Sequence, residues 1–125
     1  MKILLDNCVD VWVKRLFVGH VVEHARDRGW RQLENGKLLA AAASAGFEVM
    51  ASVDKNIRFQ QNLNELPIPI LELNTMFTRR NDLGRLLPFL PVALEATQRF
   101  WFVSVDDHGQ LTVLVPREPR GPDPA

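Results

Sequence analysis

The sequence is short of the residues that cross-link or anchor a protein. It has one cysteine, Cys8, and three scattered histidines, so it offers neither an internal disulfide nor a tetrahedral zinc set. No apolar run reaches the roughly 18 residues of a membrane span, and the apolar stretch at the N-terminus is too short for a signal peptide. We therefore expect a cytoplasmic protein, outside the membrane, that is held together by a hydrophobic core.

Several common functional motifs are also missing. The chain has no glycine-rich phosphate loop, no nucleophile elbow of the Gly-x-Ser-x-Gly type and no His-Glu-x-x-His zinc motif. The turn that follows the first apolar run, residues 6–9, contains no glycine, which argues against a doubly wound nucleotide-binding domain. Lys and Arg total 15 and balance 15 Asp and Glu, so the chain as a whole is neutral.

What is present indicates one compact domain. Hydrophobic residues make up 46% of the 125 residues and charged residues 24%, values typical of soluble globular proteins. We expect a single domain over residues 1–115. Residues 116–125 contain four prolines and no large apolar side chain, which predicts a disordered tail.

The apolar spacing predicts strands that alternate with helices. Short apolar runs typical of buried strands cover residues 3–5, 20–24, 47–53 and 68–73. Helical spacing covers residues 9–17, 37–45 and 83–97, the last of these interrupted by Pro88 and Pro91. Two final runs, 100–105 and 111–115, flank the turn residues 106–109 and predict a C-terminal β-hairpin. Together these patterns predict an α/β fold with a mainly parallel sheet and helices on both faces.

Two aspartates stand where predicted parallel strands end. Asp6 follows the first apolar run and Asp54 follows the third. Because carboxyl ends of parallel strands meet at one edge of the sheet, the two carboxylates would lie close together, an unfavourable arrangement unless a cation separates them. Oxygen ligands favour Mg²⁺ or Mn²⁺, and such ions support phosphodiester hydrolysis. On periodicity alone, helix capping is the more frequent role of an aspartate at such a position.

The predicted strand-end loops are basic, although the chain is neutral. Together with Asp6, segments 26–37, 54–61 and 74–81 carry a net charge of +4, which leaves −4 for the rest. A cationic rim of this kind suits a phosphate backbone, while an ordinary solvated loop surface explains it equally well. Trp30, in a polar loop, is the aromatic best placed to stack on a base. The candidate phosphate-binding residues are Arg26, Arg28, Arg31, Lys55 and Arg58.

Three stretches resemble one branch of the PIN-like families. They are the opening residues 1–7, the middle segment with Gly29-Trp30 and residues 34–39, and the segment 53–63. This branch consists of small, mostly uncharacterised proteins that have been proposed as toxins of bacterial toxin–antitoxin pairs. The resemblance covers about residues 1 to 75. It implies a PIN-like three-layer α/β sandwich that cleaves RNA with Mg²⁺ or Mn²⁺ held by acidic residues.

The resemblance also implies roles for individual residues. Asp6 and Asp54 match the family's acids at the ends of its first and third strands. Asn7 stands where the branch commonly has Glu, and Asn35 and Lys37 stand where it commonly has an acid. Active members use three or four carboxylates, so Glu34 would have to supply a third. Asn7, Asn35 and Asn56 would support the metal shell as neutral oxygen donors, which weakens metal affinity relative to carboxylates.

These observations lead to two hypotheses of different kinds. The first is a metal-dependent ribonuclease, the toxin of a toxin–antitoxin pair, with catalytic Asp6, Asp54 and Glu34 and with RNA and an antitoxin protein as partners. The second is an inactive PIN-like module that binds a partner protein, nucleic acid or a second copy of itself. The apolar hairpin with residues 100–102 motivates it, because an apolar edge pairs either within its own sheet or with another subunit.

Overall fold

The computed structural model describes residues 1–118, so most of the expected tail, residues 119–125, lies outside the described residues. The strands are β1 (Lys2–Leu5), β2 (Val21–His24), β3 (Val49–Ser52), β4 (Ile70–Asn74), β5 (Phe100–Asp106) and β6 (Leu111–Pro116). The α-helices are α1 (Asn35–Ser44), α2 (Ile57–Gln60), α3 (Arg80–Gly84) and α4 (Leu90–Ala96). Short 3₁₀ helices are η1 (Val11–Leu16), η2 (Ala25–Arg28) and η3 (Leu87–Phe89).

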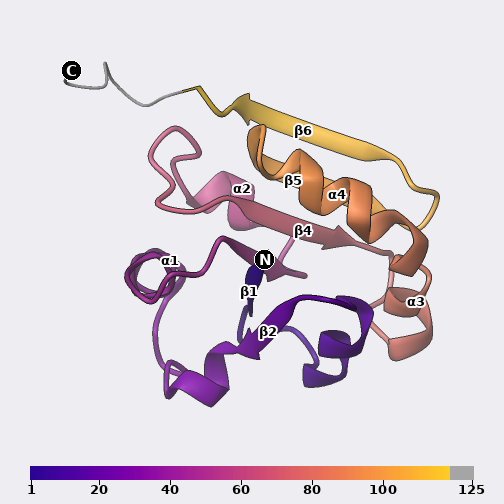
Figure 1. Ribbon diagram of the computed structural model, residues 1–125, viewed down its shortest axis with the longest axis horizontal. Helices are drawn as coiled ribbons and strands as arrows, with labels where there is room; N and C mark the ends of the chain where they lie inside the picture. Colours follow the sequence, from indigo (N-terminus) through magenta and orange to yellow (C-terminus); the bar gives the residue numbers. More distant parts are fainter. Residues whose placement is uncertain (119–125) are drawn as a thin grey trace.

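A six-stranded sheet forms the centre of the molecule (Figure 1). Its strand order is β2-β1-β3-β4-β5-β6, with parallel pairing from β2 through β5 and antiparallel pairing of β6 with β5. The predicted mainly parallel sheet is therefore confirmed. The apolar strand β5 pairs with β4 on one side and with β6 on the other, so its backbone hydrogen bonds are made inside this chain.

Helices pack against both faces of the sheet, as predicted, and an apolar core fills each of the two interfaces. One core lies between the sheet and η1, α3 and α4, with Val13, Leu83 and Leu90 among its members. The other lies between the sheet and α1 and α2, with Leu38, Ile57 and the fully buried Phe102. The inner strands β1, β3 and β4 are buried on both faces because helices pack against each face, whereas the edge strands β2 and β6 are partly exposed.

The prolines divide the region 83–97 as predicted. Pro88 lies in the first turn of η3 and Pro91 in the first turn of α4, where the missing proline N–H costs no helical hydrogen bond. The structure also differs from the sequence-based prediction elsewhere, for instance at the 3₁₀ helix η2, which was not predicted. Residues 11–16 form a 3₁₀ helix rather than an α-helix, and the short helix α2 was not predicted at all. No helix among residues 1–118 is long and apolar enough to span a membrane.

The chain continues in order past the predicted domain end at residue 115. Pro116 is the last residue of β6 and pairs with Phe100. Arg117 then donates its backbone N–H to the Arg99 carbonyl at 2.7 Å and one guanidinium N–H to the Thr97 carbonyl at 2.7 Å. These contacts attach the end of the described chain to the segment that links α4 to β5.

Gly109, in the β5–β6 turn, permits a substitution test of the fold. Its φ is +83°, and an added Cβ would lie 2.7 Å from Cε1 of Phe89. Gly109→Ala is expected to lower the free energy of unfolding by about 2 kcal/mol or more, from left-handed strain together with overpacking. Gly46→Ala is the matched control, because Gly46 also has φ +83° but open space around it, and should cost about 1 kcal/mol. If urea denaturation shows equal losses of unfolding free energy for Gly109→Ala and Gly46→Ala, the close approach of residue 109 to Phe89 is contradicted.

Candidate functional site

The connections that follow β1 and β3 leave the carboxyl edge of the sheet in opposite directions. From β1 the chain passes through η1 to β2 on one side, and from β3 it passes through α2 to β4 on the other. At such a switch point the two connections leave in opposite directions and open a crevice, which is where open α/β sheets bind ligands. Asp6 directly follows β1, and Asp54 lies two residues beyond the end of β3.

Ser52 links the two aspartates. Asp6 is buried, with 5% of its surface exposed, and its Oδ2 accepts a hydrogen bond of 2.8 Å from Ser52 Oγ. The same Ser52 Oγ accepts the backbone N–H of Asp54 at 3.0 Å. The other oxygen of Asp6, Oδ1, accepts the backbone N–H of Asn7 at 2.8 Å. The hydroxyl of Ser52 therefore joins the two strand ends that the sequence predicts to meet.

The capping interpretation is resolved differently for the two aspartates. Asp10, not Asp6, caps η1, because its Oδ1 accepts the backbone N–H of Trp12 at 2.8 Å. Asp54 is half-buried, and its Oδ1 accepts the backbone N–H of Asn56 at 2.9 Å at the start of α2. Asp54 thus organises the turn into α2 with one oxygen and leaves the other without a protein partner among residues 1–118.

Neither aspartate is neutralised by a basic side chain. Within residues 1–118, no Lys, Arg or His nitrogen lies within ion-pair distance of Asp6 or Asp54. Asp6 is the buried one of the two, and a buried carboxylate without a cation is costly. Carboxylate oxygens such as those of Asp6 and Asp54 are also the ligands that a divalent ion of the Mg²⁺ class prefers. In the described part of the chain, however, no three or more His, Cys, Asp or Glu side chains are grouped so that they could hold a metal ion.

The other predicted supporting residues lie in different surroundings. Glu34 and Asn35, at the start of α1, line a hollow of about 340 Å³ together with Gly36, Gln60 and Gln61. No hydrogen bond in the described chain joins either of them to Asp6 or Asp54. Asn56 is exposed and contacts Asp54 through its backbone.

The side-chain amide of Asn7 has a hydrogen-bond partner for its nitrogen but none for its oxygen. Its Nδ2 donates to the Trp30 carbonyl at 3.1 Å, which orients the amide. Its Oδ1 is buried and has no hydrogen-bond partner within residues 1–118. A buried acceptor without a donor costs about 1–3 kcal/mol, so it calls for a bound group. The unpartnered Oδ1 of Asn7, which lies next to Asp6 in the sequence, is therefore suited to act as a ligand of a cation.

The predicted phosphate-binding residues divide into two groups. Arg28 forms an ion pair of 2.9 Å with Glu23 and lies over the rings of Trp30 and Phe47. This stacking on Trp30 competes with the base stacking that the sequence suggested for that ring. Arg58 lies over the rings of Phe59 and Phe102. Three residues are exposed and make no ion pair within residues 1–118: Arg26, Arg31 and Lys55.

Sequence reasoning missed a second buried carboxylate. Glu72, in the middle of β4, is fully buried, and its Oε1 accepts a hydrogen bond of 2.8 Å from Ser104 Oγ on β5. Its Oε2 has no partner within residues 1–118. Glu72 pairs in register with Ser52 on one side and with Ser104 on the other, so a polar row crosses the α1–α2 face of the sheet. The signal in the sequence was a glutamate inside the apolar run 68–73.

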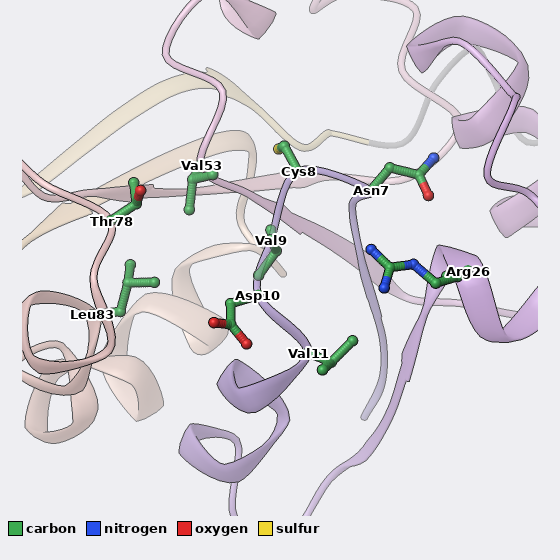
Figure 2. A pocket seen from close by; sticks show the side chains of 9 residues that line it. All are labelled: Asn7, Cys8, Val9, Asp10, Val11, Arg26, Val53, Thr78 and Leu83. Carbon is green, nitrogen blue, oxygen red and sulfur yellow. The ribbon is translucent and has the colours of Figure 1, made fainter.

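A hollow of about 340 Å³ opens at the switch point, and we name it the β1–β3 hollow (Figure 2). Its lining comes from the segment after β1 and the first residue of η1, from η2, from the residue after β3, from the segment between β4 and α3, and from α3 itself. The residues that line it are Asn7, Cys8, Val9, Asp10, Val11, Arg26, Val53, Thr78 and Leu83.

Cys8 is exposed as a residue, but its Sγ lies 3.5 Å from both Asp6 Oδ2 and Ser52 Oγ. Burial of the thiol, followed by the negative charge of Asp6, raises the pKa of Cys8 above its ordinary value of 9.0. The thiolate is the reactive form, so iodoacetamide should alkylate the folded protein more slowly at pH 8 than the urea-unfolded protein. Asp6→Asn should lower this pKa and speed the reaction. Equal rates in the folded and unfolded protein would contradict this account.

Comparison with known proteins finds no match to this chain among protein-family models, curated proteins or solved structures.

Proposed function

We propose that the protein is a metal-dependent ribonuclease of the PIN-like type, a toxin of a toxin–antitoxin pair that acts in the cytoplasm. The observation that carries this proposal is the Asp6–Ser52–Asp54 connection at the switch point, with two carboxylates that no basic residue in the described chain neutralises. The similarity of residues 1–75 to the PIN-like branch supports the choice of RNA as substrate and of a PIN-like sandwich as the finer description of the fold.

The residues present fit an ion of the Mg²⁺ or Mn²⁺ class. Asp6 and Asp54 would hold it, and the unpartnered Oδ1 of Asn7 adds a neutral oxygen donor beside Asp6. Mg²⁺ is often held by only one or two carboxylates with water completing its shell, so a pair of acids is sufficient. When bound, the ion would supply the charge that neutralises the phosphodiester and activates water.

The chain's own residues would position the reactants. Ser52 donates to Asp6 and accepts from the backbone of Asp54, so it holds both strand ends in one arrangement. Arg26, Arg31 and Lys55, which have no ion-pair partner within residues 1–118, would bind backbone phosphates, and their contribution should weaken as salt concentration rises. Arg28 contributes less, because Glu23 already pairs with it.

Incubation of the full chain with single-stranded RNA and Mn²⁺ tests the proposal. We expect cleavage that appears with Mn²⁺ or Mg²⁺ and stops when EDTA removes the ion. Cleavage that continues in EDTA would show that the metal role is wrong. Absence of cleavage with either ion, for RNAs of mixed sequence, would overturn the ribonuclease proposal.

One observation favours a second function, an inactive PIN-like module that binds a protein partner. Glu34 and Asn35 line a hollow of their own, so the structure groups fewer acids than active PIN-like nucleases use. A module of this kind would bind an antitoxin-like chain or a second copy of itself and would not bind Mn²⁺. Calorimetry distinguishes the two functions: Mn²⁺ binding supports the nuclease, and a stable dimer without Mn²⁺ binding supports the module.

A further inference from the structure

Arg58, on α2, carries a cation that no acceptor in the described chain satisfies. It is the one partly buried arginine within residues 1–118 whose side chain has neither a hydrogen bond nor an ion pair to the protein, and its Nε is buried. Its Cζ lies 5.3 Å from the ring centre of Phe59 and 5.6 Å from that of Phe102. A buried donor without an acceptor is unfavourable, and rings that exclude water leave the charge less screened. An anion bound at Arg58 would remove this cost.

The surroundings of Arg58 do not supply this anion. Glu72, on the same face of the sheet, and Glu34, on the hollow that α2 borders, form no ion pair with it. The segment 55–61 contains two cations, Lys55 and Arg58, and no acid. Lys55 is exposed and also lacks an ion pair among residues 1–118. This charge is complementary to a polyanion.

The ring of Phe59 lies open to solvent beside this cation. Phe59 is 78% exposed, and no other aromatic ring packs against it within the described chain. A single exposed apolar side chain is common and indicates nothing by itself. An exposed ring next to an unpaired arginine is different, because bases of single-stranded nucleic acids stack on such rings while the cation binds the backbone.

Helix α2 is fixed to the strand end that carries Asp54. The Oδ1 of Asp54 accepts the backbone N–H of Asn56 at 2.9 Å, and its carbonyl accepts that of Ile57 at 3.3 Å. Ile57 is fully buried in the core between the sheet and α1 and α2, so packing also holds this end of α2. Arg58 and Phe59 are the next two residues, and this anchoring fixes the backbone that presents them.

We propose that Arg58 and Phe59 bind one unpaired nucleotide of RNA, with its phosphate on the guanidinium and its base stacked on the exposed ring. The fork of N–H donors of Arg58 matches phosphate oxygens, and every base offers a flat face, so this pair binds without strong base preference. A carboxylate of a partner protein would also neutralise Arg58, but a nucleotide brings the anion and the flat ring in one unit. The choice of RNA rests on the proposed function.

Fluorescence anisotropy of the full chain in EDTA, with a labelled single-stranded RNA of about ten nucleotides, tests this proposal without cleavage. We expect Phe59→Leu to bind at least about fivefold more weakly, because leucine is apolar but offers no flat face for a base. Arg58→Gln should bind at least about tenfold more weakly, from loss of a charged hydrogen bond, and its affinity should depend less on salt. Phe59→Leu should leave binding of duplex RNA unchanged, since paired bases remain stacked inside the helix.

The matched control is Phe77→Leu. Phe77 is 56% exposed and has the guanidinium of Arg79 at 5.1 Å from its ring centre, but Asp82 neutralises Arg79 at 2.9 Å. Phe77→Leu should therefore bind single-stranded RNA as the wild type does. An equal loss of affinity in Phe59→Leu and Phe77→Leu would overturn the assignment of the site to α2.

The other outcomes separate this proposal from the proposed function. The expected losses of RNA affinity, in a chain that cleaves no RNA with Mn²⁺ or Mg²⁺, would retain the nucleotide site and overturn the nuclease. Metal-dependent cleavage together with unchanged affinity in Phe59→Leu and Arg58→Gln would retain the nuclease and overturn the site. A less stable Arg58→Gln that binds RNA normally would show a structural role for Arg58 and overturn the site as well. Inorganic phosphate that competes with RNA as strongly as nucleoside 5′-monophosphates would show an anion site without base stacking, which also overturns the proposal.

Discussion

Asp6→Asn and Asp54→Asn will each reduce Mn²⁺-dependent RNA cleavage by at least about 100-fold, if the proposed function is right. An amide is a neutral, weaker ligand than a carboxylate, so each substitution removes half of the negative charge that would hold the ion. Asn has nearly the shape of Asp, so Asp54→Asn retains an oxygen that can accept from the Asn56 backbone. Asp6→Asn retains only one of the two acceptor oxygens that Asn7 and Ser52 use, so its folding must be checked before its activity is compared. Initial cleavage rates and calorimetric Mn²⁺ affinities of the same preparations measure the effect.

The matched control is Asp106→Asn. Asp106 also ends a strand, is also half-buried, and uses Oδ1 to accept the backbone N–H groups of His108 and Gln110 in a turn. It lies at the end of β5, away from the switch point, and should leave the cleavage rate unchanged. Full activity in both Asp6→Asn and Asp54→Asn, with folding confirmed by circular dichroism, would show that the two carboxylates do not hold the metal ion.

Ser104→Ala is expected to cost about 1–3 kcal/mol of unfolding free energy, the penalty for leaving a buried polar group without its hydrogen-bond partner. Ser104 Oγ is the one hydrogen-bond donor to Glu72 within residues 1–118, and Glu72 is fully buried with its second oxygen unpartnered. Removal of the hydroxyl leaves the carboxyl without a donor in the core. Urea denaturation followed by circular dichroism measures the loss.

The double variant Glu72→Leu with Ser104→Ala distinguishes this explanation from simple loss of packing. Replacement of both members of a buried polar pair by apolar groups is often neutral or stabilising, so the double variant should recover most of the loss. Ser44→Ala, at the exposed end of α1, is the control and should stay within about 0.5 kcal/mol of the wild type. A double variant less stable than Ser104→Ala would contradict the account of Glu72.

Local sequence patterns predicted the secondary structure correctly where a single physical requirement determines which residues are accepted. A continuous apolar run predicted β1, because a strand buried on both faces leaves no polar alternation. Pro88 and Pro91 predicted the division of region 83–97, since proline is accepted only in the first turn of a helix. Helix α2 escaped prediction because four residues are too few to show a helical period.

The sequence by itself determined the alternating strands and helices and the two aspartates at strand ends, because apolar period and the residue after a strand are local properties. Only the tertiary structure decided that β1 and β3 are neighbours, that Ser52 joins Asp6 to Asp54, and that Glu34 lines a separate hollow. It also revealed Glu72 as a buried carboxylate beside Ser104. The reason is that strand order and the direction of side chains depend on pairings between residues far apart in the chain, which no local pattern records.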